Sequence, residues 1–207
     1  GAAALSIGAI FWNAGRDTGG IQNRMGSMFF MLLYLTLMSL SSLPVWREDR
    51  LLFLRERASG AYGTRAYFTS VVCFDILVLR VAPPLFFSLV AYPMVGLRWS
   101  WDDPITSTWC VLWFSAVTVL TNIAASALCM AIGIVSPTNA VANACGLLAL
   151  LTSVLCGGFL LNAQGDNRGP NWATEALTRA SFVNYAFDAL LTLIAPDRCQ
   201  AFQNKIL

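Results

Sequence analysis

The sequence contains no histidine, and its only lysine among 207 residues is Lys205. Without histidine, a Ser-His-Asp triad, a Cys-His pair and a histidine-bound zinc site are all excluded. Without an earlier lysine, a G-x-x-x-x-G-K-S/T phosphate loop is excluded as well. Charged residues make up 12% of the chain and hydrophobic residues 57%, whereas a soluble domain has about 25% charged residues. These deficits predict a membrane protein with no catalytic site in this chain.

The sequence also gives little indication of a metal site or of a nucleic-acid partner. The net charge is only +2, and the basic residues do not form one long block, so no nucleic-acid partner is expected. The six cysteines form no C-x-x-C pair, and five of them lie in apolar surroundings, where a thiol behaves as a small hydrophobe. Cys199, in a polar tail, is the one disulfide candidate. No metal site is predicted.

Long apolar runs, in contrast, are abundant. A helix needs about 20 apolar residues to cross a ~30 Å hydrocarbon core. The uncharged run 104–165 is too long for one crossing, and Ser136-Pro137-Thr138-Asn139 divides it in two. The fold class expected is an all-α helical bundle, a single transmembrane domain over residues 1–207. The chain starts with Gly inside an apolar run, so we expect it to be a piece of a longer protein. The predicted spans, the first one partial, are residues 1–12, 28–46, 66–97, 108–135 and 140–161.

Arginines gather in one of the connections between these spans. Residues 46–65 contain five arginines, whereas the loops predicted on the other side contain few. Because basic residues concentrate in cytoplasmic loops, we expect this connection to be cytoplasmic. No helix breaker occurs before Gly60, so the stretch predicts a short helix that projects from the membrane. Its apolar side could insert into a groove on a partner or lie among lipid headgroups, and the pattern favours neither.

Polar residues inside the apolar runs predict specific contacts between helices. Asp75 and Arg80 are about 140° apart on a helix, so each is expected to find polar partners on neighbouring helices or to reach the interface. Pro83-Pro84 should kink or break the helix. Thr118, Asn122 and Ser126 form a polar stripe beside the small residues Ala125, Cys129 and Gly133. This pattern favours helix packing over substrate contact.

The segment 176–194 is moderately apolar but is interrupted by Arg179, Asn184 and Asp188. It is a poor span, and we expect a re-entrant or interfacial helix on the outer side. Irregular backbone at membrane depth is tolerated only where protein covers it. The segment should therefore pack on the other helices.

Four motifs in a fixed order extend over most of the chain: GIQNRMGSMFF at residues 20–30, FLRERASGAYGTRAYF at 53–68, the spacing of Asp75 and Arg80 with Pro83 beyond, and GGFLLN at 157–162. In this order the chain resembles the transmembrane domain of G-subfamily ATP-binding cassette (ABC) transporters, the white/breast-cancer-resistance-protein type of half-transporter. The resemblance implies six helices per half, of which the end of the first to the fifth lie here. The sixth helix and the nucleotide-binding domain would lie outside this chain, so the transmembrane domain would be truncated at both ends.

The resemblance also implies an ATP-driven exporter that works by alternating access as a homodimer or heterodimer, with ATP and magnesium bound at the missing domain and membrane lipids around it. Its cargo would be a hydrophobic small molecule, a lipid or a sterol, in a plasma or organelle membrane. Arg55 and Glu56 would belong to the coupling helix that rests on the nucleotide-binding domain, Glu56 being tied to a basic partner there. Asp75 and Arg80 would belong to a polar network that links the coupling helix to the substrate cavity.

By the same resemblance, a substrate cavity lies on the dimer axis. Phe159 and Leu160 match an apolar plug between this cavity and the exit. A helical channel or scaffold that does not use ATP is the alternative function. The expected cavity residues are Phe30, Leu33, Tyr34 and Leu37 on one side, and Leu151, Val154 and Leu155 on the other.

Overall fold

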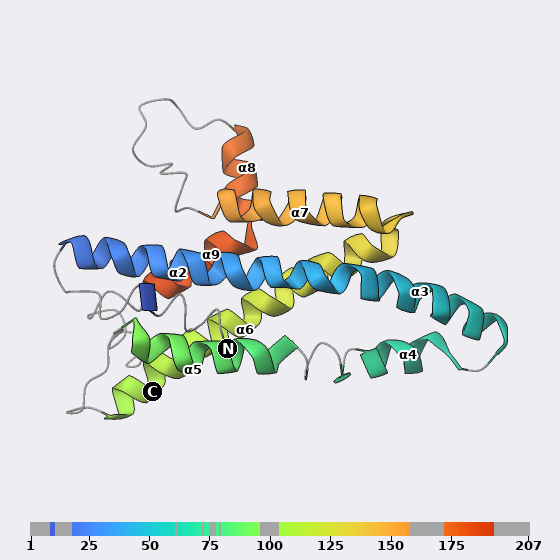
Figure 1. The fold of residues 1–207 in the computed structure, drawn as a ribbon, viewed down its shortest axis with the longest axis horizontal. Coiled ribbons are helices and arrows are strands. Elements are labelled where there is room, and N and C mark those ends of the chain that lie inside the picture. The colour runs from blue at the N-terminus through green and yellow to red at the C-terminus, as the bar shows by residue number, and fades with distance from the viewer. Residues whose placement is uncertain are drawn as a thin grey trace.

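A computed structural model describes residues 9–10, 18–60, 62–71, 73–74, 78, 80–95, 104–157 and 172–192. These residues form a bundle of helices, with a hairpin that projects from one end of it (Figure 1). The helices are α2 (Thr18–Met38), the 3-10 turn η1 (Ser39–Ser42), α3 (Leu43–Ala58), α4 (Thr64–Val71), α5 (Arg80–Met94), α6 (Pro104–Val135), α7 (Asn139–Leu155), α8 (Trp172–Ala180) and α9 (Phe182–Leu191).

Helices α2 and α3 follow one another through η1 as an almost continuous rod (Figure 1). Its stretch Asn23–Ala58 has 36 residues, or roughly 54 Å at 1.5 Å per residue. That length exceeds the ~30 Å core of a bilayer. The predicted span 28–46 and the predicted projecting helix after it are thus parts of one rod, whose α3 end extends beyond the apolar section.

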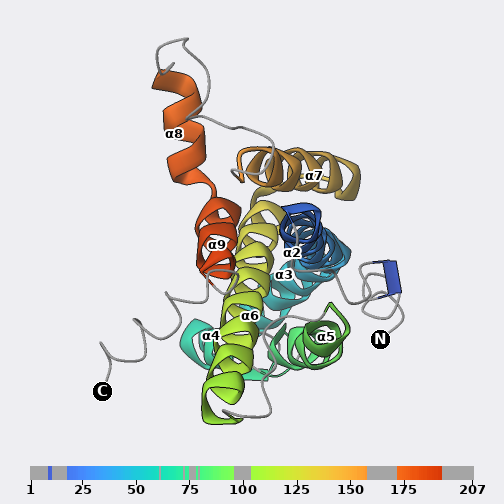
Figure 2. The ribbon, with the colours of Figure 1, turned by 90° about the vertical axis from the view of Figure 1, so that its left-hand side faces the viewer.

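Helix α6 lies at the centre of the bundle, and α2, α5, α7 and α9 surround it (Figure 2). Its segment Thr108–Val135, the predicted fourth span, is long and apolar enough to cross a membrane. Helix α7 begins four residues after α6 ends, with Thr138 as its N-cap accepting from the Val141 amide. The predicted division of the uncharged run at Ser136–Asn139 is therefore confirmed.

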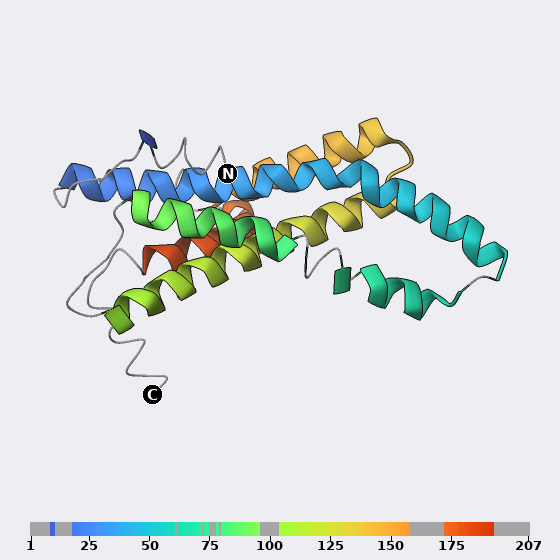
Figure 3. The same ribbon diagram turned by 60° about the horizontal axis from the view of Figure 1, so that its bottom comes forward.

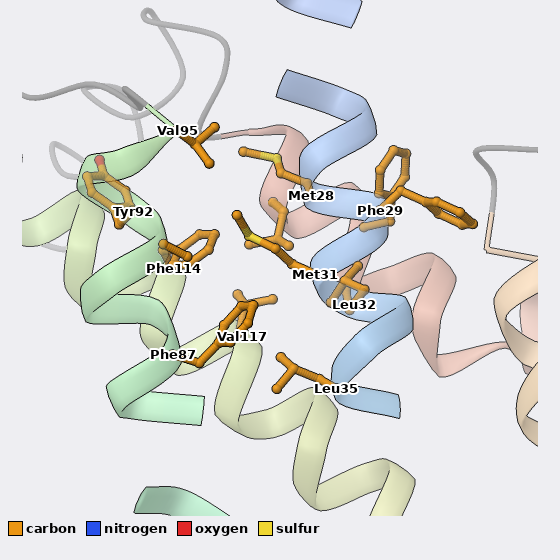
Figure 4. Close-up of a cluster of buried hydrophobic side chains, with 14 of the residues drawn as sticks. Met28, Phe29, Met31, Leu32, Leu35, Phe87, Tyr92, Val95, Phe114 and Val117 are labelled. Carbon is orange, nitrogen blue, oxygen red and sulfur yellow. The ribbon is translucent and has the colours of Figure 1, made fainter. Parts of the chain in front are cut away.

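The main core lies where α2, α5, α6 and α9 meet. Met28, Met31 and Leu32 of α2 lie opposite Phe87 and Tyr92 of α5 and Phe114 of α6 (Figure 4). The Tyr92 and Phe114 rings meet edge to face, 5.5 Å apart. In lipid the hydrophobic effect does not drive helices together, so such close van der Waals packing must stabilise the bundle.

A second, smaller cluster joins α3, α6 and α7 around Leu43, Ala125, Cys129 and Leu150. Here the small residues act as predicted, because they let helices approach closely. A Cβ atom on Gly133 would lie 3.2 Å from the Leu43 carbonyl oxygen and 3.4 Å from Trp46 Cβ. Thr118, Asn122 and Ser126 are buried in the same helix, which agrees with their predicted role in packing.

The chain does not break at Pro83-Pro84, since α5 begins at Arg80 and runs through the pair. Pro83 and Pro84 have no backbone N–H, so neither can donate to a carbonyl one helical turn earlier. Pro84 leaves the Arg80 carbonyl without its helical donor. The Asn122 side chain of α6 donates to that carbonyl instead, at 2.7 Å. A polar residue of the predicted stripe thus compensates for a proline on the next helix.

The segment after residue 171 forms α8 and α9, which meet at Ser181. The Ser181 hydroxyl donates to the Ser153 carbonyl of α7 at 2.6 Å and accepts from the Asn184 amide as the N-cap of α9. Val183, Phe187 and Leu190 are buried against the bundle. The prediction that this poor span packs on the other helices is confirmed.

Candidate functional site

The α3–α4 hairpin projects beyond the ends of the other helices (Figure 3). Its first arm starts with Pro44 in the first turn, where proline costs no hydrogen bond. It ends before Gly60, whose φ of 76° suits a residue without a Cβ atom. The predicted helix before Gly60 is confirmed. The second arm, α4, has no buried residue, so the hairpin depends on a few side-chain contacts.

Three aromatic side chains join the two arms. Phe53 of α3 stacks on Tyr67 of α4 with ring centroids 4.5 Å apart, and Tyr62 of the turn lies 5.9 Å from Tyr67 and nearly parallel to it. Aromatic pairs at these separations attract one another beyond their burial. The cluster therefore fixes the angle between α3 and α4.

Glu56 is attached to this cluster, because the Tyr62 hydroxyl donates to Glu56 Oε2. This bond, with partial burial and the negative charge of Glu56, raises the pKa of Tyr62 to about 12. Burial first, then the charges of Asp49 and Glu56, raise the pKa of Tyr67. The two phenols therefore stay protonated at neutral pH. The resemblance implied a basic partner for Glu56 in another domain, and inside this chain its partner is a tyrosine.

Two arginines of α3, Arg50 and Arg55, have different surroundings. The Arg50 guanidinium donates to the Ile134 carbonyl in the last turn of α6, where cations are stabilised by the helix dipole. Arg50 therefore joins the hairpin to the end of the central helix. Arg55, the other predicted coupling residue, is exposed at the tip of the hairpin beside Glu56. Arg55 and Glu56 are thus both on the part that projects farthest.

The predicted cavity residues of α2 share one side of that helix, as a spacing of three and four residues requires. Phe30 is 49% exposed, and Leu33 and Leu37 are partly buried. Tyr34 is partly buried because its ring stacks on Phe87 of α5, 5.6 Å away. Phe30 is therefore the member of this group that is open to a partner, whereas Tyr34 is partly engaged within the bundle.

On α7 the predicted cavity residues point in two directions. Val154 is buried in the main core, which includes α2. Leu151 and Leu155 are exposed, and Leu148 extends the same outer face by one turn. Helices α2 and α7 are neighbours in the bundle, and each has exposed apolar side chains. That these residues line a substrate cavity stays a prediction.

The remaining predicted residues are only partly within the described chain. Asp75, Phe159 and Leu160 lie outside the described residues. Arg80 is half-buried at the start of α5, close enough to α6 for its charge to act on the Cys129 thiol. Its Nε atom is buried and has no hydrogen-bond partner among the described residues. The neighbouring helix contacts its backbone carbonyl instead, through Asn122.

Sequence reasoning missed Phe53, Tyr62 and Tyr67 as functional positions. Their signal was present, because aromatic residues recur on both sides of the Gly60 turn. It could be interpreted only once the turn brought the two sides together. Trp46 was also missed, since it was interpreted only as the end of a span.

A protein-family model described as the ABC-2 type transporter matches residues 2–194, nearly the whole chain. The chain belongs to this family. Its relatives place it in the G subfamily of ABC transporters, which confirms the resemblance seen in the motifs. The helical bundle agrees with such a membrane domain, so this ABC-2 domain is a membrane protein.

Three curated relatives illustrate the similarity. The domain is 40% identical over 158 residues to ABC transporter G family member 24 of Dictyostelium discoideum, covering 76% of this chain and 13% of that protein. It is 31% identical over 188 residues to a probable ATP-dependent permease of Saccharomyces cerevisiae, covering 91% and 17%. It is 28% identical over 186 residues to the broad substrate specificity ABC transporter ABCG2 of Sus scrofa, covering 90% and 27%. The ABC-2 domain thus spans between 13% and 27% of the length of these relatives.

Proposed function

We propose that this domain is the permease part of an ATP-driven exporter of hydrophobic small molecules or lipids, including sterols. The observation that carries the proposal is the match to the ABC-2 family over residues 2–194. Two relatives are named as an ATP-dependent permease and as a transporter of broad substrate specificity. The domain would work as half of a dimer by alternating access, with a nucleotide-binding domain in the same chain.

The α3–α4 hairpin supports a coupling role in this proposal. It projects from the bundle (Figure 3), and its stacked rings and the Tyr62–Glu56 bond make it a stiff lever. The nucleotide-binding domain would bind ATP and magnesium and press on the tip at Arg55 and Glu56. Arg50 would pass the movement to α6 through the Ile134 carbonyl. The five arginines of 46–65 favour a cytoplasmic position for this end.

The exposed apolar side chains of α2 and α7 support a dimeric translocation path. Phe30, Leu151 and Leu155 are large and exposed, and an exposed apolar surface of this kind marks a protein or lipid contact. Facing a second half-transporter, these side chains would exclude water until the helices separate. Phe159 and Leu160 would close the path toward the outer side.

The test uses the full-length protein reconstituted in proteoliposomes. ATP hydrolysis is measured with a panel of lipids, sterols and drugs, and transport of any stimulating compound is then measured with ATP and with a nonhydrolysable analogue. We expect stimulated hydrolysis and transport only with hydrolysable ATP. Transport that proceeds equally without ATP would contradict the proposal and favour a channel. A reading frame without a phosphate loop and an ABC signature would contradict it too.

A further inference from the structure

A cavity of about 280 Å³ lies at the base of the hairpin, between its two arms and the last turns of α6. Its volume is near the lower end of the range for small-molecule pockets. The hairpin end of the bundle thus contains a partly open cavity whose lining residues come from α3, α4 and α6 and not from α2 or α7. Its apolar walls include Trp46 and Leu54 of α3, Phe68 and Val71 of α4, and Met130 and Ile134 of α6.

One wall of this cavity has an unsatisfied hydrogen-bond donor. Trp46 is only 5% exposed, and its Nε1–H has no partner among the described residues. Buried donors without a partner are rare in native proteins. The nitrogen itself has almost no accessible surface, so a ligand oxygen would accept from it only after the ring moves. An apolar molecule that carries a hydrogen-bond acceptor would satisfy this donor.

The cavity also has a cationic side. Arg50 lies one helical turn after Trp46 on the same face of α3 and lines the cavity. A guanidinium has five N–H donors, so Arg50 can contact an anion while it donates to the Ile134 carbonyl. Arg55, Arg57 and Arg65 are exposed on the same hairpin. Residues 46–65 have five arginines and three carboxylates, a net charge of +2.

We propose that this cavity binds an anionic phospholipid. An acyl chain would fill the apolar space, an ester carbonyl would accept from Trp46 Nε1, and the headgroup phosphate would contact Arg50. The site depends on the orientation proposed above, because anionic lipids are concentrated in the cytoplasmic leaflet and attract basic segments there. Three elements form the site: α3, α4 and the last turns of α6. The lipid would hold the hairpin at a fixed angle to the bundle.

The experiment uses the full-length protein in phosphatidylcholine nanodiscs that contain a small fraction of diazirine-labelled phosphatidylserine, or of the matching phosphatidylcholine probe. After irradiation, labelled peptides are identified by mass spectrometry. We expect the phosphatidylserine probe to label α3, α4 or the end of α6 several-fold more than the phosphatidylcholine probe does. Trp46→Phe keeps an aromatic side chain but removes the indole N–H, and should lower that labelling several-fold.

Two further variants make the result specific. Trp172→Phe is the matched control, because Trp172 of α8 is 84% exposed and far from the cavity in sequence and fold. It should leave the labelling unchanged. Leu54→Trp fills the cavity from a half-exposed position and should abolish the labelling. Thermal unfolding of each variant checks that the domain is folded.

Equal labelling by both probes that Trp46→Phe leaves unchanged would mean surrounding bilayer lipid only, and would overturn the proposal. Absence of labelling, with Leu54→Trp still lowering ATP hydrolysis, would mean that a protein segment fills the cavity, and would overturn it too. Labelling requires neither ATP nor transport, and nanodiscs expose both membrane faces. A failure of the proposed export function therefore leaves this measurement interpretable.

Discussion

At one end of the bundle, α2, α5, α6 and α9 bury a continuous set of large side chains, with Phe114 and Met31 fully inaccessible (Figure 4). At the other end, the α3–α4 hairpin is held by three rings, the Tyr62–Glu56 bond and the Arg50 cap on α6. The packed end has many contacts, and its stability is distributed over all of them. The hairpin has few, and each is a specific contact between two groups.

This difference suits a lever fixed to a rigid support. Dense packing transmits displacement because it cannot deform continuously, whereas a sparsely contacted segment can move as a unit. A substitution at the packed end should therefore cost stability first. A substitution in the hairpin should cost coupling while the fold survives.

The largest loss of stability is expected for Phe114→Ala at the centre of the packed end. Phe114 is 0% exposed, and its ring contacts Tyr92. In soluble cores a Phe→Ala change costs about 3–5 kcal/mol. We expect about 3 kcal/mol here, because the separated helices remain in lipid and only the packing is lost. Thermal unfolding of the full-length protein in nanodiscs measures the effect. Phe86→Ala, at a residue 72% exposed on α5, should be close to neutral, and equal losses would contradict the comparison.

Gly133→Leu should disrupt the contact between α3 and α6, where the hairpin joins the packed bundle. A Cβ atom at Gly133 already lies 3.2 Å from the Leu43 carbonyl oxygen, so a larger side chain must push α3 away from α6. Overpacking of this kind costs about 1–3 kcal/mol. Thermal unfolding measures the loss, and the ratio of transport to ATP hydrolysis should fall with it. Gly63→Leu is the control, because nothing lies within 4 Å of a Cβ atom there. An unchanged Gly133→Leu protein would mean that α3 and α6 are not tightly joined.

Much of the packed end could be predicted from the sequence. The break at Ser136–Asn139, the packing of the polar stripe and the docking of the segment after residue 171 all follow from local patterns. The helix through Pro83-Pro84 could not be predicted, because it depends on the Asn122 amide that reaches the Arg80 carbonyl from another helix. Sequence spacing describes one helix at a time, and this compensation needs two.

The first helix of the hairpin could be predicted from the sequence, but the contacts that join its two arms could not. The arginines and Gly60 indicated a projecting element, and the family motif pointed to Glu56. The partner of Glu56 inside the chain is Tyr62, which only the turn brings close. Likewise Arg50 was counted only as one of the five arginines of residues 46–65, whereas its side chain donates to Ile134 of α6, 84 residues away along the chain. Such contacts between separate segments leave no periodic pattern of residues in the sequence.

Glu56→Ala should uncouple ATP hydrolysis from transport while the bundle stays folded. The substitution removes both the acceptor for Tyr62 and any contact that Glu56 makes with the nucleotide-binding domain. We expect transport per ATP hydrolysed to fall about tenfold, which is close to 1.4 kcal/mol of coupling. Proteoliposome transport and ATPase rates measure the ratio, with Glu48→Ala, at an exposed position on the same helix, as the control. Full coupling in Glu56→Ala would contradict the lever.

Tyr62→Phe separates the two roles of Glu56. It keeps the ring on Tyr67 but removes the hydroxyl that donates to Glu56. We expect a smaller loss of coupling than in Glu56→Ala, about two- to threefold, because only one hydrogen bond is lost. Tyr185→Phe is the matched control, since its hydroxyl donates to a carbonyl on α8 away from the hairpin. If the two substitutions reduce coupling equally, Glu56 acts through Tyr62 alone.

The smallest effect on coupling is expected from a rise in pH. Even an unchanged coupling ratio tests the Tyr62–Glu56 bond. The Tyr62 hydroxyl donates only while protonated, and its pKa is raised from 10.0 to about 12 in the folded hairpin. A raised pKa means that the bond contributes fully below pH 10 and is lost as the pH rises toward 12. The coupling ratio of wild type to Tyr62→Phe should therefore stay constant between about pH 7 and about pH 9. A ratio that approaches one by pH 9 would mean that the phenol ionises early. The carboxylate of Glu56 would then not be holding the proton of Tyr62, and the hairpin would be braced by its stacked rings alone.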